Sequence, residues 1–130
     1  VLAGFMRILG ADFVKRYQGK ILNIHPSLLP DYPGTNTHQR VLDAGEKSHG
    51  VSVHFVTEEL DGGPVIAQES ISIQSCDDAE SLAIKTHEKE HLLYPIVASW
   101  FADGRLRLDG NDAFLDEQLL AANGEQIDTS

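Results

Sequence analysis

Two stretches of alternating apolar and polar residues place the strongest constraint on the fold. The first covers residues 49–56 and has one face made of Val51, Val53 and Phe55 and another made of Ser52, His54 and Val56. The second covers residues 65–73, and the turn-forming sequence Asp61-Gly62-Gly63-Pro64 separates the two. A period of two is typical of a strand with one buried face, so we predict two half-buried strands that pair antiparallel.

Short continuous apolar runs closer to the amino terminus predict strands that are covered on both faces. Val1–Phe5 and Ile21–His25 are such runs, and between them Ala11–Gln18 has the apolar spacing of a helix that ends at Gly19. Pro26 ends the second run, because proline cannot donate a hydrogen bond within a sheet.

Two later segments are predicted helices. Thr37–Ala44 is short, and a longer helix begins at Asp77, Asp78 and Glu80, whose charges suit a helix amino terminus. Pro95 should kink this helix and Gly104 should end it.

Beyond the long helix, residues 105–109 and 113–115 suggest a hairpin, and the residues from Leu119 on are mostly polar. We predict an open α/β sheet of parallel strands with an antiparallel edge over residues 1–118, followed by a disordered tail over 119–130.

Composition excludes several classes of function. The 130 residues include 10 basic and 20 acidic side chains, and a net charge of −10 argues against nonspecific nucleic-acid binding. The single cysteine, Cys76, excludes an internal disulfide framework and suits a reducing compartment such as the cytoplasm. The longest apolar stretch, Leu92 to Ala102, is shorter than the roughly 20 residues that cross a bilayer.

The chain begins without methionine, inside the apolar run VLAGFMRIL. A signal peptide has its basic residues before its apolar region, whereas Arg7 lies within this run. We expect a carboxyl-terminal part of a larger domain whose amino-terminal half lies upstream; a processed mature terminus is the alternative.

The carboxyl end of the second predicted strand carries the first candidate for chemistry. Asn23 and His25 are two residues apart in a strand and therefore share a face. An imidazole can move a proton and an amide can donate to an oxyanion, so the pair suits a reaction at a carbonyl. Asp61 could orient the imidazole, or it could serve only the turn. The structural alternative is a buried, hydrogen-bonded histidine beside an asparagine that satisfies the loop backbone.

The other histidines are weaker candidates. His54 shares a strand face with Ser52 and could line the same cleft, although a core position is favoured. His87 and His91 lie in the sequence HEKEH, which matches the H-E-x-x-H form of metalloproteases. A third ligand is not evident in the sequence, so we predict no metal cofactor.

The chain resembles the folate-dependent formyltransferases in two stretches, NIHPSLLPDYPG and HGVSVHFVTEELDGGPVIAQ, and the likeness extends from Val1 to about Leu108. It is greatest for the branch that formylates glycinamide ribonucleotide in purine biosynthesis. The resemblance implies a Rossmann-like fold and a catalytic trio of Asn23, His25 and Asp61. It implies that the co-substrate 10-formyltetrahydrofolate is bound by Met6, Arg7, Ile8, Leu9, Asn23, Val56, Thr57, Glu58, Glu59, Leu60 and Asp61. It also implies that glycinamide ribonucleotide is bound by Pro26, Gly34, His87, Glu88, Lys89 and Glu90.

This chain departs from the family pattern at three points. Asn36 stands where many relatives have histidine, and His87 stands where glutamine is expected. The glycine-rich loop that holds the substrate phosphate in the family is absent from this sequence.

The resemblance implies the reaction as well. The substrate amine attacks the formyl carbon, Asn23 and protonated His25 stabilise the oxyanion, and Asp61 favours the charged imidazole. The implied partners are small molecules, without nucleic acid or membrane, and a homodimer is left open.

Two alternatives remain. One is a formyltetrahydrofolate hydrolase, which gives the formyl group to water. The other is a catalytically incompetent fragment, or an association module that lacks the phosphate-binding half.

Overall fold

The computed structural model describes residues 22–29, 31–32, 36–57, 63–109 and 112–129. The predicted strand over 1–5 and helix over 11–18 lie outside the described residues. Within them, the larger sheet has the order β1-β2-β3-β7. Its strands are β1 (Leu22–His25), β2 (Ser48–Phe55), β3 (Val65–Ser72) and β7 (Glu125–Gln126).

The central pairing of this sheet is antiparallel, as the alternating segments predicted. β2 pairs antiparallel with β1 on one side and with β3 on the other, whereas β7 pairs parallel with β3. A mixed sheet with a long helix packed on one face confirms the α/β class.

The prediction that β2 is half-buried is wrong. Seven of its eight residues are buried, and only Ser48 is exposed. Val51 and Val53 belong to the apolar core, while Ser52 on the opposite face receives a hydrogen bond from the Leu29 amide and donates one to the Ser27 carbonyl. The segment that follows β1 therefore covers the Ser52 face of β2, which the alternation had predicted to be exposed.

Helix α3 (Ala79–Ala102) begins where the sequence predicted. The Asp78 carboxylate accepts a hydrogen bond from the Ser81 amide at 2.8 Å, and the Ser81 hydroxyl accepts one from the Asp78 amide at 3.0 Å. This reciprocal capping box satisfies backbone donors that the helix itself cannot pair. The helix continues through Pro95 and ends before Gly104, whose φ of +73° suits glycine.

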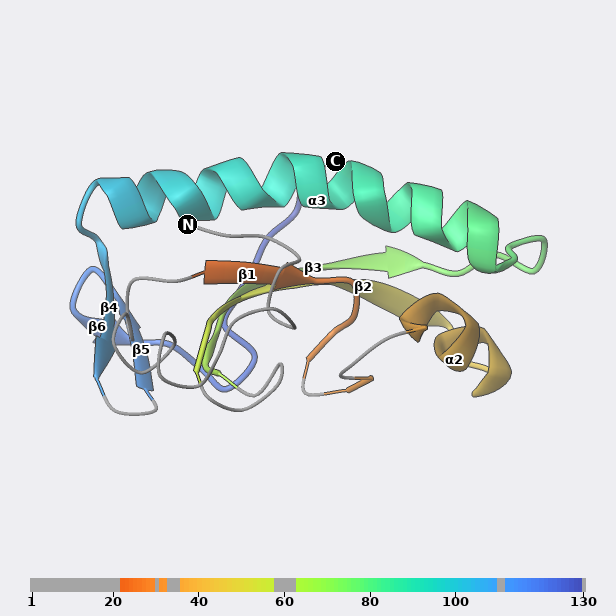
Figure 1. The fold of residues 1–130 in the computed structure, drawn as a ribbon, viewed down its shortest axis with the longest axis horizontal. Coiled ribbons are helices and arrows are strands. Elements are labelled where there is room, and N and C mark those ends of the chain that lie inside the picture. Colours follow the sequence, from red (N-terminus) through yellow and green to blue (C-terminus); the bar gives the residue numbers. More distant parts are fainter. Residues whose placement is uncertain (1–21, 30, 33–35, 58–62, 110–111, 130) are drawn as a thin grey trace.

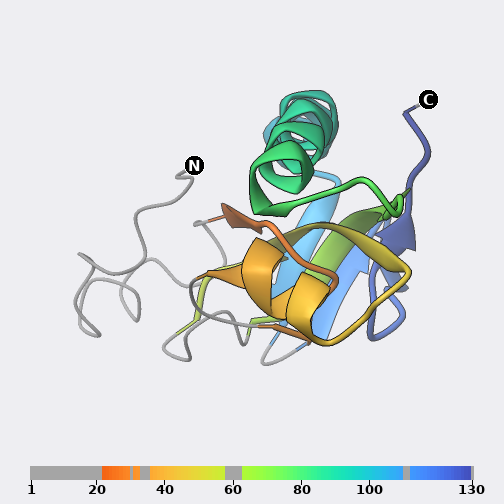
Figure 2. The ribbon, with the colours of Figure 1, turned by 90° about the vertical axis from the view of Figure 1, so that its right-hand side faces the viewer.

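Helix α3 lies along one face of the sheet (Figure 1), and the view along the helix in Figure 2 shows the two as separate layers. Leu93 and Val97 of α3 pack with Val51 and Val53 of β2 in the main core. Helix α2 (Thr37–Asp43) contacts α3, in the region where β2 begins. Among the described helices none is long and apolar enough to cross a membrane.

A second sheet follows α3. It contains β4 (Leu106–Asp109), β5 (Asp112–Leu115) and β6 (Gln118–Leu119), in that order and antiparallel throughout. The predicted hairpin after Gly104 is therefore present.

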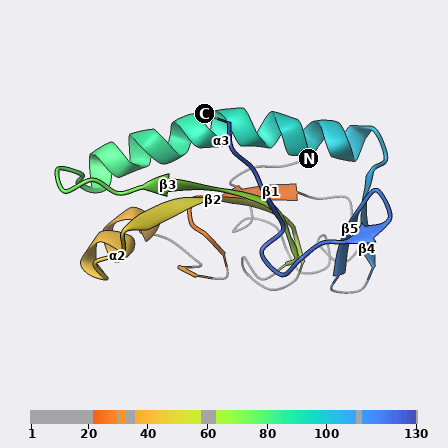
Figure 3. The ribbon, with the colours of Figure 1, turned by 180° about the vertical axis from the view of Figure 1, so that it is seen from behind.

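The carboxyl-terminal segment returns to the main sheet, although its composition led us to expect a frayed tail. In Figure 3 it runs at the front of the view, on the β3 side of the sheet, and ends at α3. The Ile127 amide donates to the Gln68 carbonyl at 2.8 Å, and the Thr129 hydroxyl donates to the buried Glu69 carboxylate at 2.7 Å. Gly124 has a φ of +71° and lies against the Ile66 backbone, where a side chain would collide. The division of the chain at residue 118 stays a prediction.

Candidate functional site

His25 lies at the carboxyl end of β1 and is 5% exposed. Its Nε2 donates a hydrogen bond to the Tyr32 carbonyl oxygen at 2.9 Å. Because a carbonyl only accepts, this contact places a ring proton on Nε2 and fixes the orientation of the imidazole. Tyr32 has a φ of +53°, an uncommon backbone conformation that turns the loop back toward β1.

Asn23 lies two residues before His25 and is also 5% exposed. Its partner across the β1–β2 ladder is His54, and that of His25 is Ser52. His54 is fully buried, and its Nδ1 donates to the Phe55 carbonyl, so it is a core histidine as the sequence suggested. The structure thus brings Asn23 and His25 to the same strand end.

Two further histidines extend the site beyond β1. His38 of α2 and His49 of β2 approach with Nδ1 and Nε2 3.2 Å apart, and their rings are perpendicular. Burial, together with the charges of His38 and His25, lowers the pKa of His49 to about 4. Burial also lowers the pKa of His38, with the charge of His25 as the second cause. The charge of His25 therefore acts on both His38 and His49.

The low pKa of His49 predicts acid sensitivity of the fold. Between about pH 6.5 and pH 4 the unfolded chain binds a proton at His49 that the folded chain does not, so stability falls as pH falls through this window. The shift corresponds to at most about 3 kcal/mol. We expect urea denaturation to show this loss between pH 7 and pH 4 and the variant His49→Gln to show a smaller one. If the free energy of unfolding fell equally with pH in the two proteins, the low pKa of His49 would be contradicted.

A cavity of about 620 Å³ lies beside these histidines. Four residues predicted to bind the nucleotide substrate line it: Pro26, His87, Glu88 and Glu90. The other lining residues are His38, Glu80, Ala83, Ile84 and Thr86. The cavity therefore joins the end of β1 to one face of α3.

A smaller cavity of about 280 Å³ adjoins the same face of α3 and shares His87 and Glu90 with the first. Its other lining residues are Ile24, His91, Tyr94 and Pro95. Burial raises the pKa of Glu90, against the opposing effect of His87, whose Nδ1 lies 3.5 Å from the carboxylate. Burial also raises the pKa of Tyr94 to about 12, so its hydroxyl keeps its proton at neutral pH. This region can offer carboxylate, imidazole and hydroxyl groups to a polar ligand.

Lys89 is placed apart from the other predicted contacts on α3. It lies two residues after His87, about 200° around the helix, and its Nζ is 3.2 Å from the Glu69 carboxylate. It lines neither cavity that His87 and Glu90 share. The ion pair with Glu69 gives Lys89 a structural role, and its contact with the substrate stays a prediction.

Of the remaining predicted site residues, only Val56 and Thr57 lie in the described part of the chain. Val56 is buried and Thr57 half-buried, directly after β2. The next described residue is Gly63. A side chain at this position would collide with the Phe55 carbonyl, so only glycine fits. The other predicted residues lie outside the described part of the chain: Met6, Arg7, Ile8, Leu9, Gly34, Glu58, Glu59, Leu60 and Asp61. Their roles stay predictions.

Sequence reasoning missed Tyr32, His38, His49 and Tyr94. Tyr32 acts through its carbonyl, which every residue type possesses, so no sequence signal could have found it. His38 and His49 come from a helix and a strand that no shared periodicity connects. Asn36, a departure from the family pattern, begins α2 with a φ of +60°, which asparagine tolerates better than most residues.

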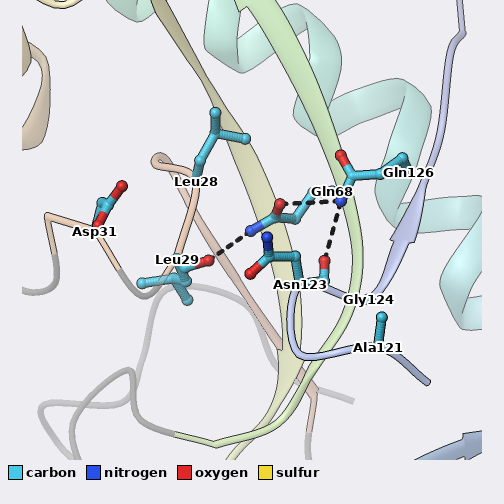
Figure 4. Close-up of a pocket in the computed structure, with 8 residues that line it drawn as sticks. All are labelled: Leu28, Leu29, Asp31, Gln68, Ala121, Asn123, Gly124 and Gln126. Atoms are coloured by element: carbon cyan, nitrogen blue, oxygen red, sulfur yellow. Dashed lines mark hydrogen bonds between the residues drawn. The ribbon is translucent and has the colours of Figure 1, made fainter. Parts of the chain in front are cut away.

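A third cavity, of about 480 Å³, lies between the loop after β1 and the carboxyl-terminal segment (Figure 4). Gln68 donates to the Leu29 carbonyl at 2.7 Å and accepts from Gln126 at 3.2 Å, so its amide links the two segments. No predicted site residue lines this cavity, and its one acidic lining residue is Asp31. The first two cavities are therefore the candidate site.

Comparison with known proteins bears on this site. The formyl transferase family model matches residues 1–98. A phosphoribosylglycinamide formyltransferase of Escherichia coli (strain K12) is 53% identical over 98% of this chain and 60% of its own length. The solved structure of such an enzyme from Coxiella burnetii is 54% identical, with a TM-score of 0.90 over 96% of this chain and 59% of its own.

A more distant solved structure offers a contrast. A formyltetrahydrofolate deformylase from Pseudomonas syringae pv. tomato is 27% identical, with a TM-score of 0.80 over 85% of this chain and 37% of its own. The chain spans about three fifths of the length of the curated bacterial relatives named phosphoribosylglycinamide formyltransferase, 60% and 58% in two cases.

Proposed function

The chain belongs to the formyl transferase family, and on that premise we propose that it transfers a formyl group from 10-formyltetrahydrofolate to the amine of glycinamide ribonucleotide in purine biosynthesis. The observation that carries the proposal is the placement of Asn23 and His25 together at the end of β1, beside a cavity lined by Pro26, His87 and Glu90.

The hydrogen bond of His25 supports a proton-transfer role. The hydrogen bond from Nε2 to the Tyr32 carbonyl orients the imidazole. A neutral imidazole can accept a proton, and the charged imidazole can donate it to the oxyanion or to the departing folate nitrogen. A ring held in one orientation is what a general acid–base group needs.

Asn23 complements this chemistry. When the amine attacks, the formyl oxygen acquires negative charge, and a side-chain amide held in place can donate a hydrogen bond to it. Asp61, which the family resemblance assigns to the same centre, would favour the charged imidazole. The reaction then needs no metal: attack, oxyanion stabilisation and proton transfer use these three side chains.

Glu90 is placed to bind the molecule that accepts the formyl group, the ribonucleotide substrate. It is half-buried at the junction of the two cavities, and its carboxylate can accept hydrogen bonds from the hydroxyl or amine groups of a nucleotide-like substrate. Glu80 and Glu88 line the same cavity, so an anionic phosphate would be held by donors elsewhere in the protein.

The competing function is hydrolysis of 10-formyltetrahydrofolate, which the similarity to a deformylase structure supports. The higher identity to the transferase relatives favours transfer to an amine. The proposed partners are accordingly small molecules, and the proposed location is the cytoplasm, which the single exposed cysteine suits. A homodimer is a further proposal.

Consumption of 10-formyltetrahydrofolate by the intact protein separates the two functions. We expect consumption to depend on added glycinamide ribonucleotide and to fall at least tenfold without it. Consumption at the same rate in its absence would identify a hydrolase. No consumption under either condition would contradict the proposal.

A further inference from the structure

Helix α3 carries a pair of histidines of which only one, His87, has a predicted role in binding the substrate. His87 and His91 are one turn apart on an exposed face, and their Nε2 atoms lie 2.9 Å apart. Their rings are perpendicular, with centroids 4.4 Å apart. The two nitrogens face each other across a hydrogen bond, and two imidazoles one turn apart on a rigid helix can bind a single transition-metal ion in its place.

We propose that His87 and His91 bind a divalent transition-metal ion of the class that prefers imidazole, such as Zn²⁺ or Cu²⁺, through their Nε2 atoms. Metal–nitrogen bonds of about 2.0–2.1 Å place two ligands ~2.9 Å apart at a square-planar Cu²⁺ and ~3.4 Å apart at a tetrahedral Zn²⁺. The two Nε2 atoms, 2.9 Å apart, match the first value and need to separate by about half an ångström for the second. A slight rotation of the exposed rings directs both lone pairs at one ion.

Glu90 supplies a second, independent observation. Its Oε2 lies 3.5 Å from Nδ1 of His87, on the side of the ring opposite the proposed ion. A carboxylate in this position receives the Nδ1 proton of a metal-bound histidine, which fixes the tautomer and strengthens the ligand. Glu90 and His87 therefore already form the carboxylate–histidine part of a carboxylate–histidine–metal arrangement.

The pair binds an exchangeable ion rather than a structural one. Within the described part of the chain no three histidine, cysteine or acidic side chains converge as a metal-binding group, so water completes the coordination. The net charge of −10 attracts cations to the surface. His87, His91 and Glu90 all line the 280 Å³ cavity, so a bound ion occupies part of the candidate site.

Calorimetric titration of chelator-treated protein with Zn²⁺ tests the site. We expect saturable binding that His87→Gln and His91→Ala each weaken at least tenfold, with Glu90→Gln producing a smaller loss. Both histidines are exposed, and circular dichroism checks that each variant is folded. With Cu²⁺ as the probe, electron paramagnetic resonance should detect nitrogen ligands that disappear in His91→Ala.

The matched control is His38→Asn, which breaks the other close histidine pair, that of His38 and His49. Zn²⁺ binding should survive this change. Absence of binding in the unmodified protein, unchanged affinity in His87→Gln, or a loss confined to His38→Asn would each overturn the proposal.

A functional consequence rests on the proposed formyl transfer. Zn²⁺ at this pair should inhibit transfer, and His91→Ala should need at least fivefold more Zn²⁺ for the same inhibition. If formyl transfer itself is disproved, the calorimetric result still decides the metal site, so the two failures are distinguishable.

Discussion

Replacing His25 with alanine should lower the turnover of formyl transfer at least about 10²-fold, because general acid–base groups typically contribute this much. The imidazole is 5% exposed and anchored at Nε2 by the Tyr32 carbonyl, so no solvent group replaces it. We expect the same loss for Asp61→Asn, which keeps the shape of the side chain and removes its charge. The measurement is steady-state kinetics with both substrates at saturation.

Two controls separate lost chemistry from lost structure. Thermal denaturation shows whether the His25→Ala variant is folded, and added imidazole should restore part of its turnover by occupying the vacated space. A loss below about fivefold in both His25→Ala and Asp61→Asn would contradict these assignments, since acid–base roles are normally worth far more.

Replacing Glu69 with alanine should lower the free energy of unfolding by about 3 kcal/mol, near the lower end of the range for removing one partner of a buried ion pair. The Glu69 side chain is 3% exposed. Its carboxylate contacts the Lys89 ammonium at 3.2 Å and accepts from the Thr129 amide and hydroxyl at 2.8 and 2.7 Å. The change leaves Lys89 in a largely buried position without this counter-ion and releases the carboxyl-terminal segment from the sheet.

Urea denaturation of a double-mutant cycle measures this effect. Lys89→Ala should cost much less in the Glu69→Ala background than alone, because its counter-ion is already absent. The exposed Glu88→Ala serves as a matched control and should change stability by less than about 0.5 kcal/mol. A loss of under about 1 kcal/mol for Glu69→Ala would show that the carboxyl-terminal segment is held by other contacts.

The sequence was informative where local chemistry decides the structure. The alternation over β2 and β3 gave their antiparallel pairing, and Asp78 and Gly104 marked the ends of α3. At the site, the two-residue spacing of Asn23 and His25 placed both at one strand end.

The sequence was uninformative where distant segments meet. The burial of both faces of β2 depends on contacts such as that of Ser52 with Leu29, 23 positions away. The segment near Thr129 appeared disordered because its stabilising partner, Glu69, lies 60 positions earlier. The coupling of His38 and His49 likewise arises from the packing of α2 against the start of β2.

The proposed function depends on where the formyl carbon goes. With 10-formyltetrahydrofolate labelled with ¹³C in the formyl group, nuclear magnetic resonance follows that carbon directly in the presence of the intact protein and glycinamide ribonucleotide. We predict that the label appears as a formamide on the ribonucleotide amine, at a rate that falls at least about 10²-fold in His25→Ala. Appearance of the label as free formate, or transfer at an undiminished rate in the variant, would contradict the account.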